Sequence, residues 1–370
     1  MNDLLQNAFG PSWIISVITF LINTTLILIV APVTFMMMTW FERRIVARMQ
    51  DRLGPNRVGP AGLLQAVADG VKMFTKEDIT PRAADRWVHL VAPIVATAPV
   101  IFLFAVIPWG YGLSPVDINV SVLFVIAISS ISAVGLMMGG WGSNNKFALL
   151  GAMRAVAQMV SYEIPAVIAL LAMVLFTSTM NLNNYSDLQG GLPLFGKTLS
   201  EFGVPDLGLG WYVFTPVGLL GFIIFFICVL SEGERTPFDI PEADSEIVAG
   251  YMTEYSGMKF AVFYMGQFLF NYALSVVASI IFLGGWNFPG IPQLISLAPP
   301  LGGLISAFVL GAKAWFLFFV MIWLRGAFPR LRVDQLMGFA WKFLLPLALI
   351  NIASAALWVT IMLWGSDPKW

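Results

Sequence analysis

Residues 118–138 read INVSVLFVIAISSISAVGLMM, a run without a single charged side chain. About 20 apolar residues in a helix are enough to cross the hydrocarbon core of a bilayer. Similar runs recur along the chain, and none shows the apolar/polar alternation of a membrane-spanning strand. The sequence therefore predicts an all-α polytopic membrane protein with about eight transmembrane helices. We expect these at Ile14–Trp40, Val88–Trp109, Ile118–Met138, Ala155–Met180, Trp211–Ser231, Phe260–Phe288, Leu301–Leu324 and Phe343–Trp364.

The composition excludes several classes of protein. Of the 370 residues, 58% are hydrophobic and 11% are charged, whereas soluble domains carry roughly a quarter charged residues. A net charge of -1 gives no basic surface for a nucleic acid. Cys228 is the only cysteine and His89 the only histidine. The chain therefore lacks the ligands for a structural zinc, an iron–sulfur cluster or a bis-His haem, and we expect it to bind no metal.

The basic residues predict the orientation in the bilayer, since loops on the inner side carry an excess of Lys and Arg. Placing the N-terminus outside puts 17 of the 20 basic residues on the inner side, nine of them between Arg43 and Arg86. Only Lys197 and Lys369 then lie outside. We expect one transmembrane domain over residues 1–370, with both termini on the outer, periplasmic side.

The inner loop at residues 41–87 contains a second kind of helix. From Leu63 to Lys76, apolar residues repeat at helical spacing, and Gln65, Asp69 and Lys72 occupy the other face. Such a pattern is typical of an amphipathic helix that lies on the membrane surface. A purely structural role for this helix is an open alternative.

The inner loop at residues 231–257 is unusually acidic for its position. Arg235 is its only basic residue before Glu254. Carboxylates that lie near one another and near apolar spans can share protons, so the loop is a candidate proton path. A solvated loop that contacts a basic partner is the alternative. The acids concerned are Glu232, Glu234, Asp239, Glu242, Asp244, Glu246 and Glu254.

Two charged residues fall inside the predicted spans. Glu163 is the only acid in any of them, and an ionisable residue within the membrane is by default a functional candidate. Pro165 follows two residues later and predicts a broken or hydrated helix. A protonated carboxyl that serves only packing is the alternative. Lys313 either extends its ammonium to the membrane surface or pairs with a carboxylate, and its role stays open.

Several motifs in order resemble one known family. From Trp40 to Pro346 the chain closely resembles the H subunit of proton-pumping NADH:quinone oxidoreductase, respiratory complex I, whose mitochondrial counterpart is the mitochondrially encoded subunit 1. The motifs that carry the resemblance are Trp40–Arg44, Gly54–Pro60, Ser161–Pro165, Glu232–Glu242, Ser245-Glu246, Glu254–Gly257 and Arg325–Met337.

This resemblance implies a role in quinone reduction coupled to proton translocation. The quinone-binding residues that it implies are Glu42, Arg43, Arg44, Asp69, Lys72, Arg235, Asp239 and Arg325, with Arg235 and Asp239 expected as a charge pair. The proton-coupling carboxylates that it implies are Glu163, Glu232, Glu234, Glu242, Asp244, Glu246 and Glu254.

The same resemblance implies a translocase subunit without a complete active site of its own. It would bind ubiquinone or another quinone as substrate, while FMN and iron–sulfur clusters would reside in partner subunits. The expected partners are peripheral-arm subunits at the quinone site, antiporter-like membrane subunits and lipid. The expected location is the bacterial inner membrane, or the mitochondrial inner membrane in an organelle.

Other functions compete with this one. A secondary transporter or channel would also use acidic residues and Pro-broken spans, but the chain has no obvious internal repeat. A structural anchor would gain nothing from a carboxylate such as Glu163 within the membrane. The related subunit of a membrane-bound hydrogenase is the nearest alternative.

Overall fold

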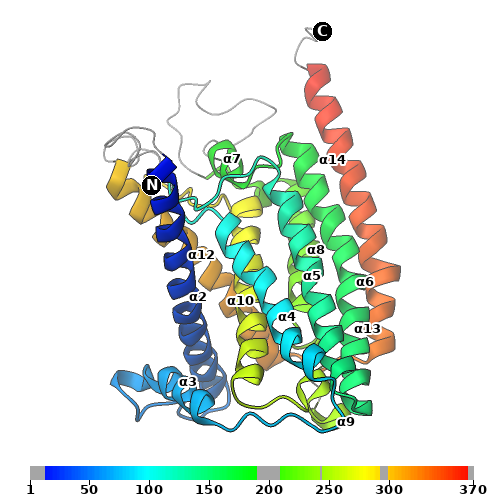
Figure 1. Cartoon of the computed structure of the whole chain (residues 1–370). Coiled ribbons are helices and arrows are strands. Elements are labelled where there is room, and N and C mark those ends of the chain that lie inside the picture. Colours follow the sequence, from blue (N-terminus) through cyan, green and yellow to red (C-terminus); the bar gives the residue numbers. More distant parts are fainter. Residues whose placement is uncertain (1–12, 190–208, 242–243, 292–298, 366–370) are drawn as a thin grey trace.

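A computed structural model describes residues 13–189, 209–241, 244–291 and 299–365, and every regular element in these ranges is a helix. Figure 1 shows a bundle of long helices. The elements are α2 (Trp13–Met49), η1 (Pro60–Gly62), α3 (Gln65–Thr75), α4 (Arg86–Val106), α5 (Ser121–Gly142), α6 (Lys146–Thr177), α7 (Leu182–Leu188), η3 (Tyr212–Phe214), α8 (Pro216–Glu232), α9 (Asp244–Ile247), η4 (Gly250–Met252), α10 (Gly257–Phe282), α12 (Pro299–Ala327), α13 (Val333–Phe339), the π-helical turn η5 (Ala340–Leu344) and α14 (Leu345–Gly365).

The eight predicted spans all coincide with helices. Seven helical stretches in the described part of the chain are long and apolar enough to cross a membrane, and the last of them joins α13, η5 and α14. The eighth predicted span corresponds to α8, an apolar helix of only 17 residues. The prediction of an all-α polytopic membrane protein is confirmed.

Local sequence explains where several spans begin. The Asp85 carboxylate accepts hydrogen bonds from the first backbone amides of α4, and Asn145 and Thr215 do the same for α6 and α8. Such caps satisfy amides that have no partner within the helix. The break expected at Pro165 is wrong, because α6 continues through it. Helix α6 packs against α5, α8 and α14, and such packing lets membrane-spanning helices tolerate a proline.

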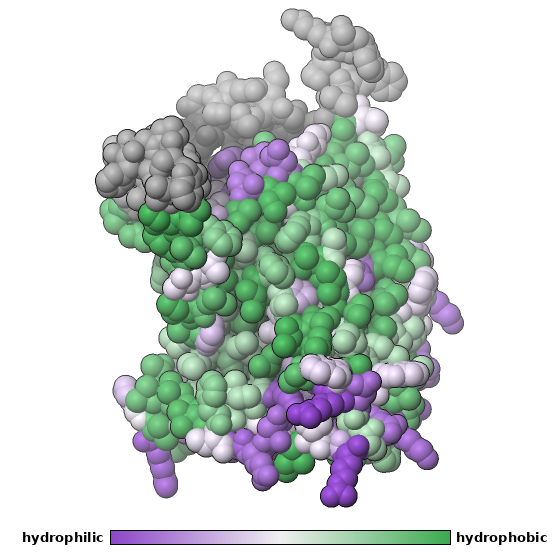
Figure 2. Space-filling model, viewed as in Figure 1, coloured by the Kyte–Doolittle hydropathy of each residue, from purple (hydrophilic) through white to green (hydrophobic). Residues whose placement is uncertain are grey.

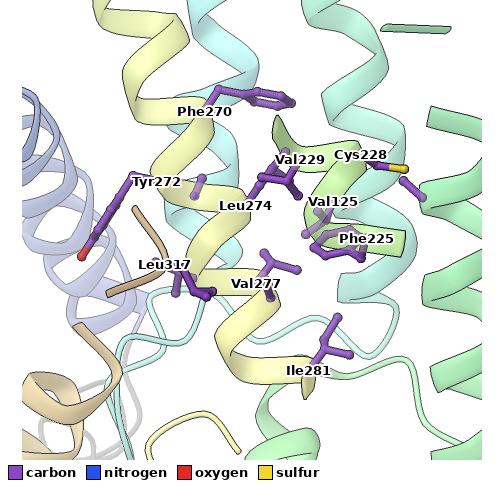
Figure 3. Packing of buried hydrophobic residues seen from close by; sticks show 14 of the residues in the cluster. Val125, Phe225, Cys228, Val229, Phe270, Tyr272, Leu274, Val277, Ile281 and Leu317 are labelled. Carbon is purple, nitrogen blue, oxygen red and sulfur yellow. The ribbon is translucent and has the colours of Figure 1, made fainter. Parts of the chain in front are cut away.

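Helix α10 forms the centre of the bundle. In its most apolar 18-residue window 89% of the residues are buried, against 17% in α2 at the edge. Figure 3 shows Leu274, Val277 and Ile281 of α10 among buried side chains of neighbouring helices, including Phe225 of α8. Residues that α10 presents to the interior are therefore held rigidly.

The polar residues gather at one end of the bundle, which we call the polar end. It contains α3, α9 and the loops on either side of them, and hydrophilic side chains concentrate there in Figure 2. Helix α3 lies beside the C-terminal end of α2, and it occupies most of the predicted amphipathic segment. Trp13 and Gly365, the first and last described residues, lie toward the opposite end.

Candidate functional site

A buried carboxylate in the last third of α2 joins three distant parts of the chain. Glu42 is only 5% exposed. One of its oxygens accepts a hydrogen bond from Arg235 Nη1 at 2.8 Å, and the other accepts one from Arg325 Nη1. Arg235 comes from the loop after α8 and Arg325 from the last turn of α12. One carboxylate between two guanidinium groups thus fixes the positions of these three elements.

Arg235 and Asp239 are both buried in this region, but they are not ion-paired with each other as expected. Arg235 pairs with Glu42 and stacks on the Phe268 ring, with its guanidinium carbon 4.0 Å from the ring centroid. Asp239 instead accepts a hydrogen bond from Arg330 Nη2 at 3.1 Å. Burial raises the pKa of the Asp239 carboxyl above its ordinary value, although the charges of Arg330, Arg325 and Arg235 act in the opposite direction. We call Glu42, Arg235, Asp239, Arg325 and Arg330 the charged cluster.

Two further buried carboxylates lie next to the charged cluster. Glu232 is the last residue of α8, and Glu234 follows after a tight turn. Glu234 accepts hydrogen bonds from the Tyr251 hydroxyl at 3.0 Å and from Gln267 Nε2 at 3.1 Å. A small cavity of about 30 Å³ is lined by both carboxylates and by mostly apolar side chains of α4, α5, α6 and α10. Both carboxylates therefore face a small, largely apolar space.

A second cavity connects these carboxylates with the charged cluster. Its volume is about 20 Å³, and its lining includes Arg235, Asp239 and Arg325. Glu234 and Gln267 line both cavities, so they stand between the charged cluster and Glu232. The ionisable groups are thus arranged in series rather than scattered over a surface.

Glu163 extends the series into the membrane-spanning part of the bundle. It lies on α6 and accepts a hydrogen bond from the Ser130 hydroxyl of α5. It is also close enough to Glu232 for the two carboxyl groups to interact electrostatically. Three of the expected carboxylates, Glu163, Glu232 and Glu234, are therefore brought together.

The remaining expected carboxylates lie elsewhere. Glu246 is exposed and pairs with Arg154 at 2.6 Å. Glu254 is half-buried and accepts a hydrogen bond from Asn145 Nδ2 at 2.5 Å. Asp244 begins the short helix α9, and Glu242 is outside the described residues. Neither Glu246 nor Glu254 lines the two cavities described above.

Comparison with known proteins identifies the family. The sequence model described as NADH dehydrogenase matches residues 22–356. The chain belongs to this family. It is 45% identical to the H subunit of NADH-quinone oxidoreductase from Chlorobaculum parvum over 86% of either chain. It is 43% identical to the protein of that name from Dehalococcoides mccartyi, over 89% of this chain and 84% of the relative. It is 42% identical to the Geobacillus sp. protein of that name, over 96% of this chain and 98% of the relative.

Membership of the family makes the chain a membrane subunit of an oxidoreductase complex of the complex I type. The family model covers all the carboxylates and arginines described above, from Glu42 to Arg330. The resemblance seen in the motifs is thereby confirmed along most of the chain.

The other residues expected to bind quinone lie at the surface of the polar end. Arg43 pairs with Asp69 of α3 at 2.5 Å, and both side chains are partly exposed. The Arg44 guanidinium lies over the Trp40 ring, 5.2 Å from its centroid, and Lys72 is exposed on α3. The Arg43–Asp69 pair attaches α3 to α2, and none of these residues lines the two cavities.

Sequence reasoning missed the amides that hold the acidic loop. Gln158 Nε2 of α6 donates to the carbonyls of Ser231 and Phe238, at 2.7 and 2.8 Å. Asn271 Nδ2 of α10 donates to the Gly233 carbonyl at 3.0 Å, close enough that a Cβ on Gly233 would collide with it. The available signal was an amide side chain within an otherwise apolar span, which is costly without a partner.

Proposed function

We propose that this chain forms part of a quinone-binding site and couples quinone reduction to proton movement through its buried carboxylates. One observation carries the proposal: three members of the charged cluster line one cavity, Glu232 lines the other, and Glu234 lines both. The relatives carry the name of the H subunit of NADH-quinone oxidoreductase, which favours a quinone as the substrate.

A quinone dissolved in the bilayer would reach the chain from the side, near α3. Arg43, Arg44 and Lys72, with Glu42 and Asp69, would flank its path at the polar end. Arg235, Asp239 and Arg325 would lie further inside, where arginine side chains can donate hydrogen bonds to the carbonyl oxygens of a quinone head group. The exposed Arg43–Asp69 pair would then act at the entrance and the charged cluster deeper in the protein.

Reduction of a quinone to a quinol consumes two electrons and two protons, and it creates negative charge until the protons arrive. Charges interact more strongly in a poorly solvated site than in water. New negative charge beside the charged cluster would therefore disfavour ionisation of Glu234 and Glu232 and draw protons toward them. Glu163 would continue this response into the membrane, and Glu242, Asp244, Glu246 and Glu254 would act on the loop side.

Other subunits would complete the enzyme. This chain has one cysteine and one histidine, so electrons would come from FMN and iron–sulfur clusters in peripheral-arm subunits. Antiporter-like membrane subunits would continue the proton path. We propose a translocase of the respiratory chain in a bacterial or mitochondrial inner membrane, with both termini of this chain on the outer side.

Neutralising the carboxylates one at a time tests the proposal. In membranes that contain the whole complex, Glu232→Gln and Glu234→Gln should lower NADH oxidation by quinone at least tenfold. Oxidation of NADH by a water-soluble artificial acceptor should stay unchanged, because it needs no quinone. Glu77→Gln, on an exposed carboxylate at the same end, is the matched control. Full quinone-linked activity in both variants would refute the coupling role.

A separate measurement tests the entrance. Removing the charge in Arg43→Ala and Lys72→Ala should raise the apparent KM for quinone several-fold with a smaller effect on kcat, since neither residue lies in the cavities. An unchanged KM in both variants would remove these residues from the quinone path.

A further inference from the structure

Lys313, within α12, is held by the backbone of the turn that follows α10. Its Nζ donates hydrogen bonds to the carbonyl oxygens of Leu283, Gly285 and Asn287, at 2.7, 2.8 and 2.7 Å. An ammonium group has three N–H donors, so all of them are used. The three carbonyls belong to the turn that ends α10.

The turn is shaped to present these carbonyls. Gly284 and Gly285 both have positive φ, and a Cβ at either position would collide, with Trp211 and with Ser186 respectively. The Trp211 ring lies 4.2 Å from Lys313 Nζ, and its Nε1 donates to the Asn287 carbonyl at 3.2 Å. Three carbonyls and an aromatic face form a complete binding site for a cation.

Of the two roles open from the sequence, pairing with a carboxylate does not describe this arrangement. The ammonium of Lys313 is bound by backbone carbonyls at the end of α10. Among the residues that the structure describes, its hydrogen-bond acceptors are carbonyls, and no carboxylate is ion-paired with it. The lysine therefore connects α12 to α10.

The two connected helices both contribute to the candidate site at the other end of the bundle. Helix α10 supplies Gln267 and Asn271, which bind Glu234 and the Gly233 carbonyl. Helix α12 supplies Arg325, which binds Glu42 and lies about 18 Å from Lys313 along the helix. The connection between α10 and α12 thus fixes the position of Arg325 relative to Gln267.

We propose that Lys313 is a positioning residue whose ammonium stays charged and fixes α12 to the end of α10, and that it does not carry protons. Three carbonyl oxygens within 2.8 Å require three N–H donors, which only the charged form has. A neutral amine has only two N–H donors, so its lone pair would face one of these oxygens and that hydrogen bond would be lost. Such a loss is costly in a buried site.

Two substitutions separate a fixed charge from a proton carrier. Lys313→Met removes the charge and all three donors, whereas Lys313→Arg keeps both, since a guanidinium stays protonated in proteins. In membranes with the whole complex, Lys313→Met should lower quinone-linked NADH oxidation at least tenfold. Lys313→Arg should recover it to within about threefold of the unchanged chain, which a proton carrier could not do.

Chemical rescue provides a second test if an arginine side chain does not fit at position 313. Lys313→Ala leaves the carbonyls in place, and ethylammonium should restore activity, whereas tetramethylammonium, which has no N–H group, should not. Full activity of Lys313→Met would overturn the proposal. Loss of activity in all three variants, without rescue by arginine or by ethylammonium, would overturn it as well.

The proposal rests on the proposed function for its activity readout, so thermal stability is measured alongside. Lys313→Met should lower the Tm of the detergent-purified complex, and Lys313→Arg should restore most of it, whether or not the chain handles quinone. If the proposed function is wrong, Glu232→Gln keeps full quinone-linked activity while this pattern of Tm values persists. If the role of Lys313 is wrong, the pattern is absent while Glu232→Gln still loses activity.

Discussion

At the polar end, Glu42 meets two arginines whose charges also act on Asp239, whereas at the opposite end Lys313 meets three backbone carbonyls. The first arrangement consists of ionisable groups beside cavities, and a change of charge on one group alters the protonation equilibria of the others. The second uses carbonyls that cannot titrate. The comparison indicates that one end is built to respond to charge and the other to stay fixed.

The hydrogen bonding supports the same contrast. Around the acidic loop, several buried polar atoms have no hydrogen-bond partner among the described residues, including Arg235 Nε, Asp239 Oδ1 and Gln158 Oε1. Lys313 has every donor in use. Buried polar atoms without partners cost free energy, so hydrogen bonding is less complete around the acidic loop than around the Lys313 ammonium.

The largest effect on stability is expected for Glu42→Gln. Removing this charge leaves Arg235 and Arg325 without their shared counter-ion, and breaking a buried ion pair costs about 3–5 kcal/mol. Thermal unfolding of the purified chain in detergent measures the loss. Asp78→Asn is the control, since Asp78 is half exposed and its pair with Lys259 should contribute less than about 1 kcal/mol. Equal losses in the two variants would contradict the importance of Glu42.

A smaller loss is expected for Gln158→Leu. The leucine leaves the buried carbonyls of Ser231 and Phe238 without their donor, at about 1–3 kcal/mol for each buried group. Unfolding measurements should show a clear loss, while Gln50→Leu, at an exposed glutamine, should change little. A Gln158→Leu chain as stable as the unchanged one would show that the loop is held without this amide.

The pH dependence of stability tests the environment of Asp239. Its pKa is raised in the folded chain, so between the unfolded and the folded pKa the folded state holds the proton that the unfolded state has released. Relative to Asp239→Asn, the unchanged chain should therefore lose stability as pH rises from about 4. The Tm of both chains across this range provides the measurement. A gain in stability with rising pH would mean that Arg330 and Arg325 outweigh burial.

The smallest effect on stability is expected at the entrance. Arg43 and Asp69 are partly exposed, and exposed ion pairs contribute about 0–1 kcal/mol. Asp69→Asn should therefore change the free energy of unfolding by less than about 1 kcal/mol, measured by the same thermal assay. A loss comparable to that of Glu42→Gln would mean that α3 is essential to the fold.

The spans were predictable because each depends on its own run of apolar residues, as 118–138 does. The contacts of the site were not, because they join residues far apart in the chain, such as Glu42 and Arg235. Arg235 and Asp239 were expected to pair because they sit in the same loop, but the loop turns one toward Phe268 and the other toward Arg330. Lys313 could not be interpreted from sequence, since its partners are backbone atoms that any residue possesses.

The number of protons moved per quinone reduced tests the central claim most directly. In sealed vesicles that contain the whole complex, proton uptake and quinone-linked NADH oxidation are recorded together for the unchanged chain, Glu234→Gln and the Glu77→Gln control. Because Glu234 stands between the charged cluster and Glu232, the ratio should fall in Glu234→Gln even for the turnover that remains. An unchanged ratio in that variant would contradict the account.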